Sequence, residues 1–483
     1  MAPLDPLPRA FTRALASPRT SLVIVFAAWK TLLLLIAFAS PGPGYDTSTT
    51  LLLGRDAAAS ALVSASVPWT ATLGERLASK LTRWDAIYFT VAAERGYQHE
   101  QDWAFSWAFN RFIAQVAKFF PVAGRPLTAH VWAGVIISHI SHLLSVLVLH
   151  RLTAIVVPGS ARKQIAFLAA ALHACSPAGV FLSAPYGEAL FSLLNFSGML
   201  WYAYARVDAA PPILAGLDEN GWRPKSARSL LYSLISGLCF GLATMVRSNG
   251  LLSGLIFFYD IIQSLHGLFG PRIGQISSLM RIIGAVIAGL LVGMGFIIPQ
   301  WLAYQQYCLK ENTRPWCSKT PPSIYSWVQK HYWNVGFLRY WTPSNIPLFL
   351  LAAPMLWVMT ISALRVIPRR LSTLPSAASA AVKQNSAEKS SMRAETPHLL
   401  VAFGLPQLVL AALAVTNFHV QIVNRISSGY PEWYIVIMSS FCHSKEPKTP
   451  AVVSQYAAKS IFRLIIVYAA VQAALFASFL PPA

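Results

Sequence analysis

Long apolar runs of about 20 residues alternate along the chain with shorter polar segments, and a run of this length spans a bilayer as one α-helix. We expect about eleven spans from this pattern. The weakest runs are 250–267 and 431–443, and the second is short enough to be re-entrant or interfacial. Because irregular backbone cannot face lipid, the pattern predicts an all-α fold, a polytopic membrane helical bundle. The expected spans lie near residues 21–40, 128–149, 164–182, 187–205, 229–246, 250–267, 283–303, 345–364, 398–416, 431–443 and 460–480.

The loops between these runs differ in charge, and alternate loops hold most of the lysine and arginine. The positive-inside rule places the basic loops and the N-terminus in the cytosol. Residues 1–483 are then one membrane domain, in which 367–397 is a flexible cytosolic linker rich in Ala, Ser and Lys. The segments expected on the luminal side are 41–127, 183–188, 247–249, 304–344 and 417–430.

The first luminal loop, 41–127, contains the sequence RWDAIYF, residues 83–89. Apolar residues including Trp84 and Tyr88 recur at helical spacing, which predicts a helix lying in the membrane interface. Asp85 falls on a neighbouring face, close to Arg83. In one interpretation Asp85 is a general base that takes a proton from a sugar hydroxyl. In the other it forms a structural pair with Arg83, and helical spacing alone favours this second interpretation.

Three other acidic residues are candidates on the predicted luminal side. Glu100 and Asp102 precede a group of aromatic residues, a combination found in sugar-binding sites and also in the aromatic belt at a membrane surface. Glu188 begins a predicted span after a Pro- and Gly-containing turn. It can bind substrate at the membrane boundary, or cap the helix, and capping is the interpretation we favour.

Arginines on the same side suggest an anion site. Arg247 and Asn249 lie at a turn between two apolar runs, and an arginine beside a helix N-terminus binds anions well. The alternative is an arginine that reaches toward water from the membrane edge. Arg425 offers a second cation on the same side, which favours the anion site. The segment 304–344 is too aromatic for a solvated loop and too polar for a span, so it forms a lid or lies at the interface.

Composition excludes several classes of protein. The chain is 55% hydrophobic and 12% charged, against about 25% charged residues in soluble domains. Its net charge of +20 is explained by loops that flank spans, so no nucleic-acid partner is expected. No nucleotide-binding fingerprint or metal-ligand spacing is present, and we predict neither a metal nor a cofactor. Cys308 and Cys317 can form a disulfide if their loop faces an oxidising compartment.

Five luminal segments resemble, in order, those of the GPI mannosyltransferase 2 family, the PIG-V type. They span most of the chain, with 41–75 and 371–396 outside the resemblance. The family has an AFFP-like run where this chain has Ala104–Phe105–Ser106–Trp107. The five segments are RWDAIYF, SPAGVFLSAPYGEALF, MVRSNGLL, RPWC with YSWVQKHYWNVGFLRYW, and Gln421 to Arg425.

The resemblance implies a GT-C-like glycosyltransferase of the endoplasmic reticulum membrane with a luminal active site. It implies transfer of the second mannose to a GPI-anchor precursor, from the lipid-linked donor dolichyl phosphate mannose, through an α-1,6 linkage and with inversion. Asp85 takes the position of the family's essential acid. The resemblance also implies a partner, because fungal enzymes similar to this type work with a separate, small membrane subunit. The substrate-binding residues we expect are Arg83, Trp84, Tyr88, Glu100, Glu188, Arg247, Asn249, Gln421 and Arg425.

Two other functions fit parts of the pattern. A transporter or flippase of an anionic glycolipid would explain arginines near the spans, but we find no repeated halves with broken helices in matching places. A non-catalytic subunit of the same pathway, or another step that uses a lipid-linked mannose donor, also fits a polytopic chain with one polar side.

Overall fold

The fold is built from helices of very different lengths. A computed structural model describes residues 9–41, 48–49, 51–53, 69–120, 126–207, 225–269, 272–309, 314–366, 387–442 and 454–480. Every regular element in these ranges is helical, which confirms the all-α prediction. The α-helices are α1 (Arg9–Ala16), α2 (Pro18–Ala39), α4 (Trp69–Leu81), α5 (Asp85–Arg95), α6 (Trp107–Ala117), α7 (Pro126–Val156), α8 (Arg162–Ala174), α9 (Glu188–Val207), α11 (Lys225–Val246), α12 (Gly254–Leu265), α13 (Arg272–Tyr307), α14 (Ile324–Trp333), α15 (Ile346–Val366), α17 (Ala387–Thr416), α18 (Val423–Ile426), α19 (Glu432–Cys442) and α20 (Gln455–Ala477).

Short 3-10 helices join several of these elements. They are η1 (Glu100–Ala104), η2 (Gly179–Leu182), η3 (Ser248–Ser253), η4 (His266–Phe269), η5 (Pro343–Asn345), η6 (Val420–Ile422) and η7 (Ser427–Gly429). Of the linker predicted at 367–397, residues 387–397 belong to α17, and 367–386 lie outside the described residues.

Seven helices in the described ranges are long and apolar enough to cross a membrane. They lie at 18–39, 126–156, 227–246, 275–307, 343–366, 398–416 and 456–477. The prediction of about eleven spans is therefore not confirmed. Three of the other predicted positions hold α8, α12 and α19, which have 13, 12 and 11 residues and are too short to span alone.

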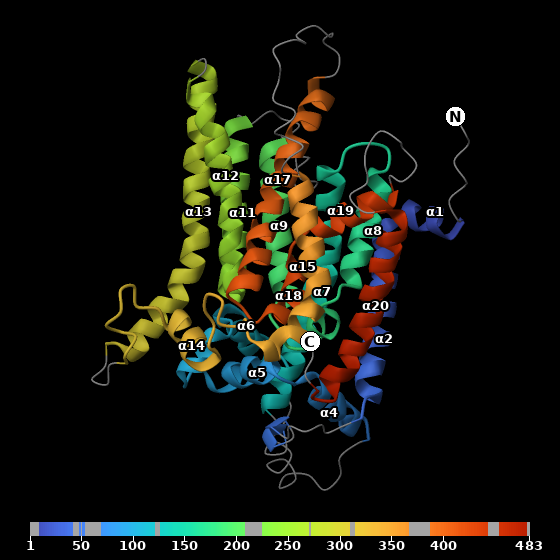
Figure 1. Ribbon diagram of the computed structural model, residues 1–483, viewed down its shortest axis with the longest axis vertical. Coiled ribbons are helices and arrows are strands. Elements are labelled where there is room, and N and C mark those ends of the chain that lie inside the picture. Colours follow the sequence, from blue (N-terminus) through green and yellow to red (C-terminus); the bar gives the residue numbers. More distant parts are fainter. Residues whose placement is uncertain are drawn as a thin grey trace.

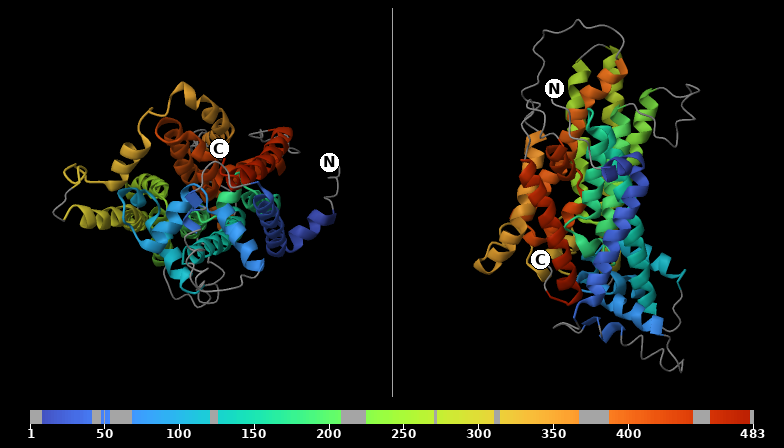
Figure 2. Two further views of the ribbon diagram at one scale, coloured as in Figure 1. Left: turned by 90° about the horizontal axis from the view of Figure 1, so that it is seen from below. Right: turned by 90° about the vertical axis from the view of Figure 1, so that its right-hand side faces the viewer.

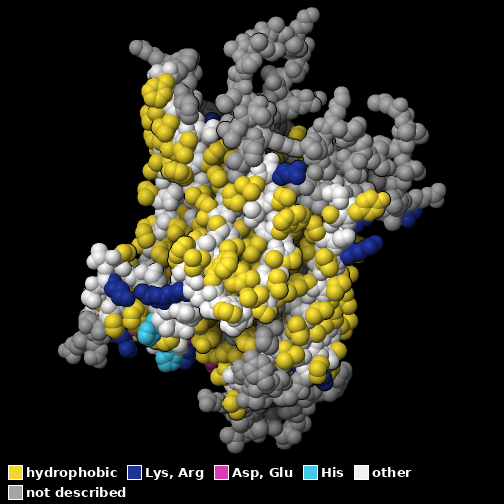
Figure 3. Space-filling model, in the orientation of Figure 1, with side chains coloured by type: hydrophobic (Ala, Val, Ile, Leu, Met, Phe, Trp, Pro, Cys, Tyr) yellow, Lys and Arg dark blue, Asp and Glu magenta, His cyan; other side chains and the backbone are white. Residues whose placement is uncertain are grey.

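The long helices run side by side, and the short helices α4, α5, α6 and α14 gather at one end of the bundle (Figure 1). We call this the site end. The N-terminal helix α1 lies toward the opposite end, as do the starts of α13 and α17 (Figures 1 and 2). Hydrophobic side chains cover most of the visible flank between the two ends, which is the surface expected of helices in lipid (Figure 3).

Close approach of backbones fixes α13 against α11. A Cβ added to Gly295 would lie 2.1 Å from the carbonyl oxygen of Gly241, and one added to Gly237 would lie 2.6 Å from Ala288 Cα. Small residues let membrane helices approach closely and gain van der Waals contact where no hydrophobic effect drives their association. Gly295 also lines the cavity described below, so this helix contact sets one wall of the site.

The polar segment 69–120 is folded into helices at the site end. The start of α5 follows Trp84, and Ala86, Phe89 and Ala93 on one face of α5 are buried. This helix crosses the end of the bundle instead of running along it, as the interfacial pattern predicted (Figure 1). The next helix, α6, begins at a Ser106 side chain that accepts a hydrogen bond from Phe109 N at 3.1 Å.

Candidate active site

A cavity of about 280 Å³ opens at the site end. Its walls come from α5, η1, the turn between α11 and η3, the last part of α13, α14, and the segment between α17 and α19. Segments far apart in sequence therefore meet around one space. The polar side chains on these walls include Asp85, Ser248, Asn249, Gln300, Gln329, His419, Arg247 and Arg425.

Asp85 is the first residue of α5, and its position is fixed from behind. Trp84 has φ 55° and ψ −127°. For a residue other than glycine this backbone conformation costs about 1–3 kcal/mol, and such strain often marks a functional site. The buried Tyr186 hydroxyl donates to Arg83 O at 3.0 Å, and Trp84 packs on Phe479 with ring centroids 5.2 Å apart. These contacts hold the strained residue and aim the carboxylate of Asp85 into the cavity.

Four charged side chains form a chain of ion pairs along the cavity wall. Arg425 Nη1 lies 2.8 Å from Asp85 Oδ2, and Arg425 Nε lies 2.9 Å from Glu188 Oε1. The same Glu188 oxygen lies 2.7 Å from Arg247 Nη1. The order is Asp85, Arg425, Glu188, Arg247, so the signs alternate and the charges sum to zero.

The four charged side chains differ in their exposure to solvent. The side chain of Glu188 is 1% exposed, whereas that of Asp85 is 35% exposed. Glu188 does not line the cavity and touches it only through the two arginines it holds. Burial lowers the pKa of Arg425, but the adjacent Glu188 and Asp85 carboxylates outweigh burial and leave that pKa above its ordinary value. Arg425 therefore stays charged at any working pH.

Aromatic side chains form an apolar part of the cavity wall. Tyr88 stacks on Phe105 with centroids 4.4 Å apart and planes at 10°. Phe105 also meets Trp333 of α14 edge-on at 5.6 Å. Burial, and then the negative charge of Asp85 and Asp102, raises the pKa of Tyr88 above its ordinary value, so its hydroxyl remains a hydrogen-bond donor. A cavity lined by both aromatic rings and charged groups suits a ligand with apolar and polar parts.

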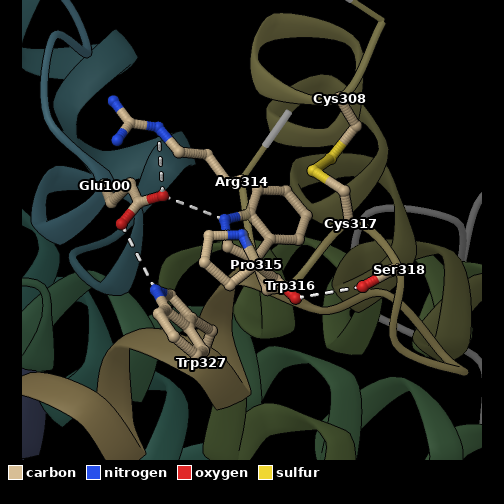
Figure 4. Close-up of a disulfide and its surroundings, with 8 residues drawn as sticks. All are labelled: Glu100, Cys308, Arg314, Pro315, Trp316, Cys317, Ser318 and Trp327. Atoms are coloured by element: carbon tan, nitrogen blue, oxygen red, sulfur yellow. Dashed lines mark hydrogen bonds and ion pairs between the residues drawn. A yellow bond between two sulfur atoms is a disulfide. The ribbon is translucent and has the colours of Figure 1, made fainter. Parts of the chain in front are cut away.

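The segment 314–333 folds over η1 and is tied to it through Glu100 (Figure 4). Glu100 Oε1 accepts from Trp316 Nε1 at 3.0 Å, and Oε2 accepts from Trp327 Nε1 at 3.3 Å. Arg314 Nε adds an ion pair at 3.6 Å. A disulfide joins Cys308 to Cys317, beside the fully buried Trp316, and holds this loop to the end of α13. This segment covers one side of the cavity, as a lid would.

The structure separates the predicted substrate-binding residues into two groups. Asp85, Tyr88, Arg247, Asn249 and Arg425 line the cavity. The other predicted residues do not line it, and they support it instead: Arg83 and Trp84 pack against Phe479, Glu100 joins two loops, Glu188 holds the arginines, and Gln421 accepts from Tyr340.

Two predicted interactions are corrected by these contacts. Asp85 was expected to pair with Arg83, but its ion-pair partner is Arg425, because Arg83 is 1% exposed and turns behind α5 toward Phe479. The capping role favoured for Glu188 is replaced by two ion pairs, since both arginines converge on the start of α9. The arginines expected to be open to an anion are thus already paired with carboxylates.

Sequence reasoning missed two cavity residues, His419 and Gln300. His419 Nε2 lies 3.0 Å from Trp333 O, and its ring stacks on Tyr340 at 4.7 Å. Gln300 lies one residue after Pro299 in α13, and its side chain accepts from Tyr325 N at 3.1 Å. A polar residue next to a proline in an otherwise apolar span was the available signal for Gln300.

The fold and site together define a multi-pass helical membrane protein with a charged and aromatic cavity at one end of its bundle. The chain matches the family described as mannosyltransferase (PIG-V) over residues 19–483, and it belongs to that family. Membership makes it a glycosyltransferase by class.

Named relatives agree with this assignment. The chain is 39% identical to GPI mannosyltransferase 2 of Aspergillus oryzae over 97% of this chain and 96% of that protein. It is also 39% identical to GPI mannosyltransferase 2 of Gibberella zeae, over 96% and 98% of the two chains. An oligosaccharyltransferase from Archaeoglobus fulgidus, with an acceptor peptide tethered to it, aligns at a TM-score of 0.43 and 13% identity. That alignment covers 96% of this chain and 56% of the archaeal one, and nothing about substrates follows from it.

Proposed function

We propose that the protein transfers the second mannose to a GPI-anchor precursor, using dolichyl phosphate mannose as donor and forming an α-1,6 linkage. Family membership and the names of the relatives support the substrate class. The Cys308–Cys317 disulfide at the site end supports a luminal, oxidising location for the cavity, in the endoplasmic reticulum. The observation that carries the proposal is that Asp85, the position of the family's essential acid, opens into a cavity shared with two arginines.

In this mechanism Asp85 acts as the general base. The acceptor 6-hydroxyl attacks C1 of the donor mannose, its proton passes to the Asp85 carboxylate, and the C1–O bond to dolichyl phosphate breaks. One displacement inverts the anomeric centre. A general base contributes about 10² to 10⁴ in rate.

Arg425 and Arg247 stabilise the phosphate that leaves. Fixed cations near a leaving oxygen favour the transition state because they need not reorganise during the reaction. Arg425 is also the ion-pair partner of Asp85 in the structure. A phosphate bound against Arg425 therefore lies beside the Asp85 carboxylate that takes the proton.

The test compares two aspartates of the same loop. Asp85→Asn keeps shape and removes the base, whereas Asp102→Asn alters a buried carboxylate that pairs with Arg95 at 3.2 Å and lies outside the cavity. With radiolabelled donor and a precursor carrying one mannose, we expect Asp85→Asn to lose about 100-fold or more in transfer rate. Asp102→Asn should retain most activity.

The result that removes Asp85 from the base role is transfer by Asp85→Asn at a rate close to that of the unmodified protein. In cells lacking the enzyme, the same variant should accumulate a glycolipid one mannose short of the product. Accumulation of a different intermediate would assign the chain to another step of the pathway. Purification with a small membrane subunit would test the partner that the family resemblance implies.

A further inference from the structure

A second polar cluster lies in the half of the bundle away from the site end, where α9, α11, α12 and α13 pack together (Figure 1). The distribution of lysine and arginine predicts that this half faces the cytosol. It shares no residue with the cavity described above and takes no part in the proposed transfer reaction.

At its centre, one buried carboxylate is shared by two arginines. Asp260 of α12 is 2% exposed and forms ion pairs with Arg206 at the end of α9 and with Arg281 of α13, the latter at 3.2 Å. The three charges sum to +1. Arg206 is itself buried, whereas the Arg281 side chain is 37% exposed, so the excess positive charge is accessible through Arg281.

Arg281 lines a second cavity of about 160 Å³ between α11 and α13. Three serines, Ser229, Ser233 and Ser277, lie on its walls together with Gly284. Among the residues that the structure describes, no acceptor reaches the buried Arg281 Nε. Hydroxyls beside a partly exposed guanidinium form a suitable set of donors for a phosphate.

Exposed aliphatic side chains lie next to this cavity. On α13, the positions adjacent to the cavity-lining residues are Ile276, Leu279 and Ile283, which are 66%, 50% and 41% exposed. Exposed aliphatic side chains beside an arginine and serines match the two parts of a phospholipid, its acyl chains and its headgroup phosphate. Basic pockets between membrane helices on the cytosolic side bind anionic lipid headgroups.

We infer that the cavity between α11 and α13 binds the phosphate of an anionic phospholipid from the cytosolic leaflet, with Arg281 as its main charged contact. Ser233 and Ser277 donate hydrogen bonds to the phosphate oxygens. The bound lipid joins α11 to α13 at the end opposite the active site.

The test measures binding to the full chain in detergent by calorimetry. The probes are a short-chain phosphatidylinositol, a short-chain phosphatidylcholine and inorganic phosphate. We expect phosphatidylinositol to bind to the unmodified protein. Arg281→Gln should weaken this binding at least about fivefold. That factor corresponds to about 1 kcal/mol, the contribution of one basic residue near an anionic leaflet. The matched control is Arg162→Gln, which removes an exposed arginine from the start of α8 at the same end and should leave affinity unchanged.

A second variant keeps the inference testable if loss of the Asp260 ion pair impairs folding. Ser277→Leu leaves that ion pair intact and places an apolar side chain in the cavity mouth, so it should also weaken binding. Equal weakening by Arg281→Gln and Arg162→Gln would mean diffuse surface attraction and would overturn the inference. So would binding of phosphatidylcholine as tight as phosphatidylinositol, or binding of inorganic phosphate alone.

Discussion

Glu188 gives the sharpest prediction, because one buried oxygen holds both arginines of the site. Its Oε1 lies 2.7 Å from Arg247 Nη1 and 2.9 Å from Arg425 Nε. Replacing Glu188 with glutamine keeps the volume and removes the negative charge. Arg425 then retains only Asp85, and Arg247 loses its ion-pair partner.

The magnitude follows from the burial of the three groups. Removing one partner of a buried ion pair costs about 3–5 kcal/mol. Because the side chains of Arg247 and Arg425 are 18% and 14% exposed, water relieves part of this cost, and we take about 3 kcal/mol. If the cost falls on the transition state, it lowers the rate about 100-fold, since about 1.4 kcal/mol corresponds to a factor of ten.

The assay must separate binding from chemistry. With Glu188→Gln the four-group chain carries a net charge of +1, so an anionic donor should bind no more weakly than before. We expect kcat to fall about 100-fold with KM unchanged or lower, the pattern of a residue that positions catalytic groups. Glu188→Asp should recover part of kcat.

Glu432 supplies the matched control. Its side chain is fully buried at the start of α19, and neither carboxylate oxygen has a hydrogen-bond partner among the described residues. Glu432→Gln should leave kcat near that of the unmodified protein. Our reasoning is refuted if Glu188→Gln keeps kcat within about threefold, or if its whole effect is a rise in KM.

Three further changes test other parts of the site. Arg425→Lys keeps the charge but cannot hold Asp85 and Glu188 from two separate nitrogens, so kcat should fall about tenfold or more, measured in the same transfer assay. Glu100→Gln should lower the melting temperature and make the loop carrying Trp316 and Trp327 more sensitive to proteolysis, because one carboxylate accepts from both indoles; unchanged proteolysis would contradict this role. Since burial raises the pKa of Tyr88 above its ordinary value, that phenol stays neutral at neutral and mildly alkaline pH. Tyr88→Phe should therefore not change the shape of the pH–rate profile between neutral pH and pH 9, even if it changes the rate.

The sequence by itself determined the class of fold, and it predicted which side of the membrane holds the candidate site. Apolar runs and basic loops are local features, and lipid imposes a local rule, since each spanning segment must satisfy its own backbone hydrogen bonds as a helix. The same local reasoning placed Asp85, Arg247 and Arg425 on one side of the membrane. Its count of about eleven spans is not confirmed by the seven long apolar helices of the described ranges. An apolar run such as 431–443 does not show whether its helix crosses lipid or, like α19, is enclosed by neighbouring helices.

Only the tertiary structure decided which of these charges are partners. Helical spacing suggested Arg83 for Asp85, yet Arg83 turns behind α5 and Arg425 arrives from a distant segment. Glu188 resembled a cap in sequence and is instead the anchor of two arginines. Periodicity reports the environment of a residue along its own helix, whereas an ion pair depends on where separate helices end relative to one another. That relation is fixed by packing, such as the contact of Gly295 with Gly241, and no single segment contains it.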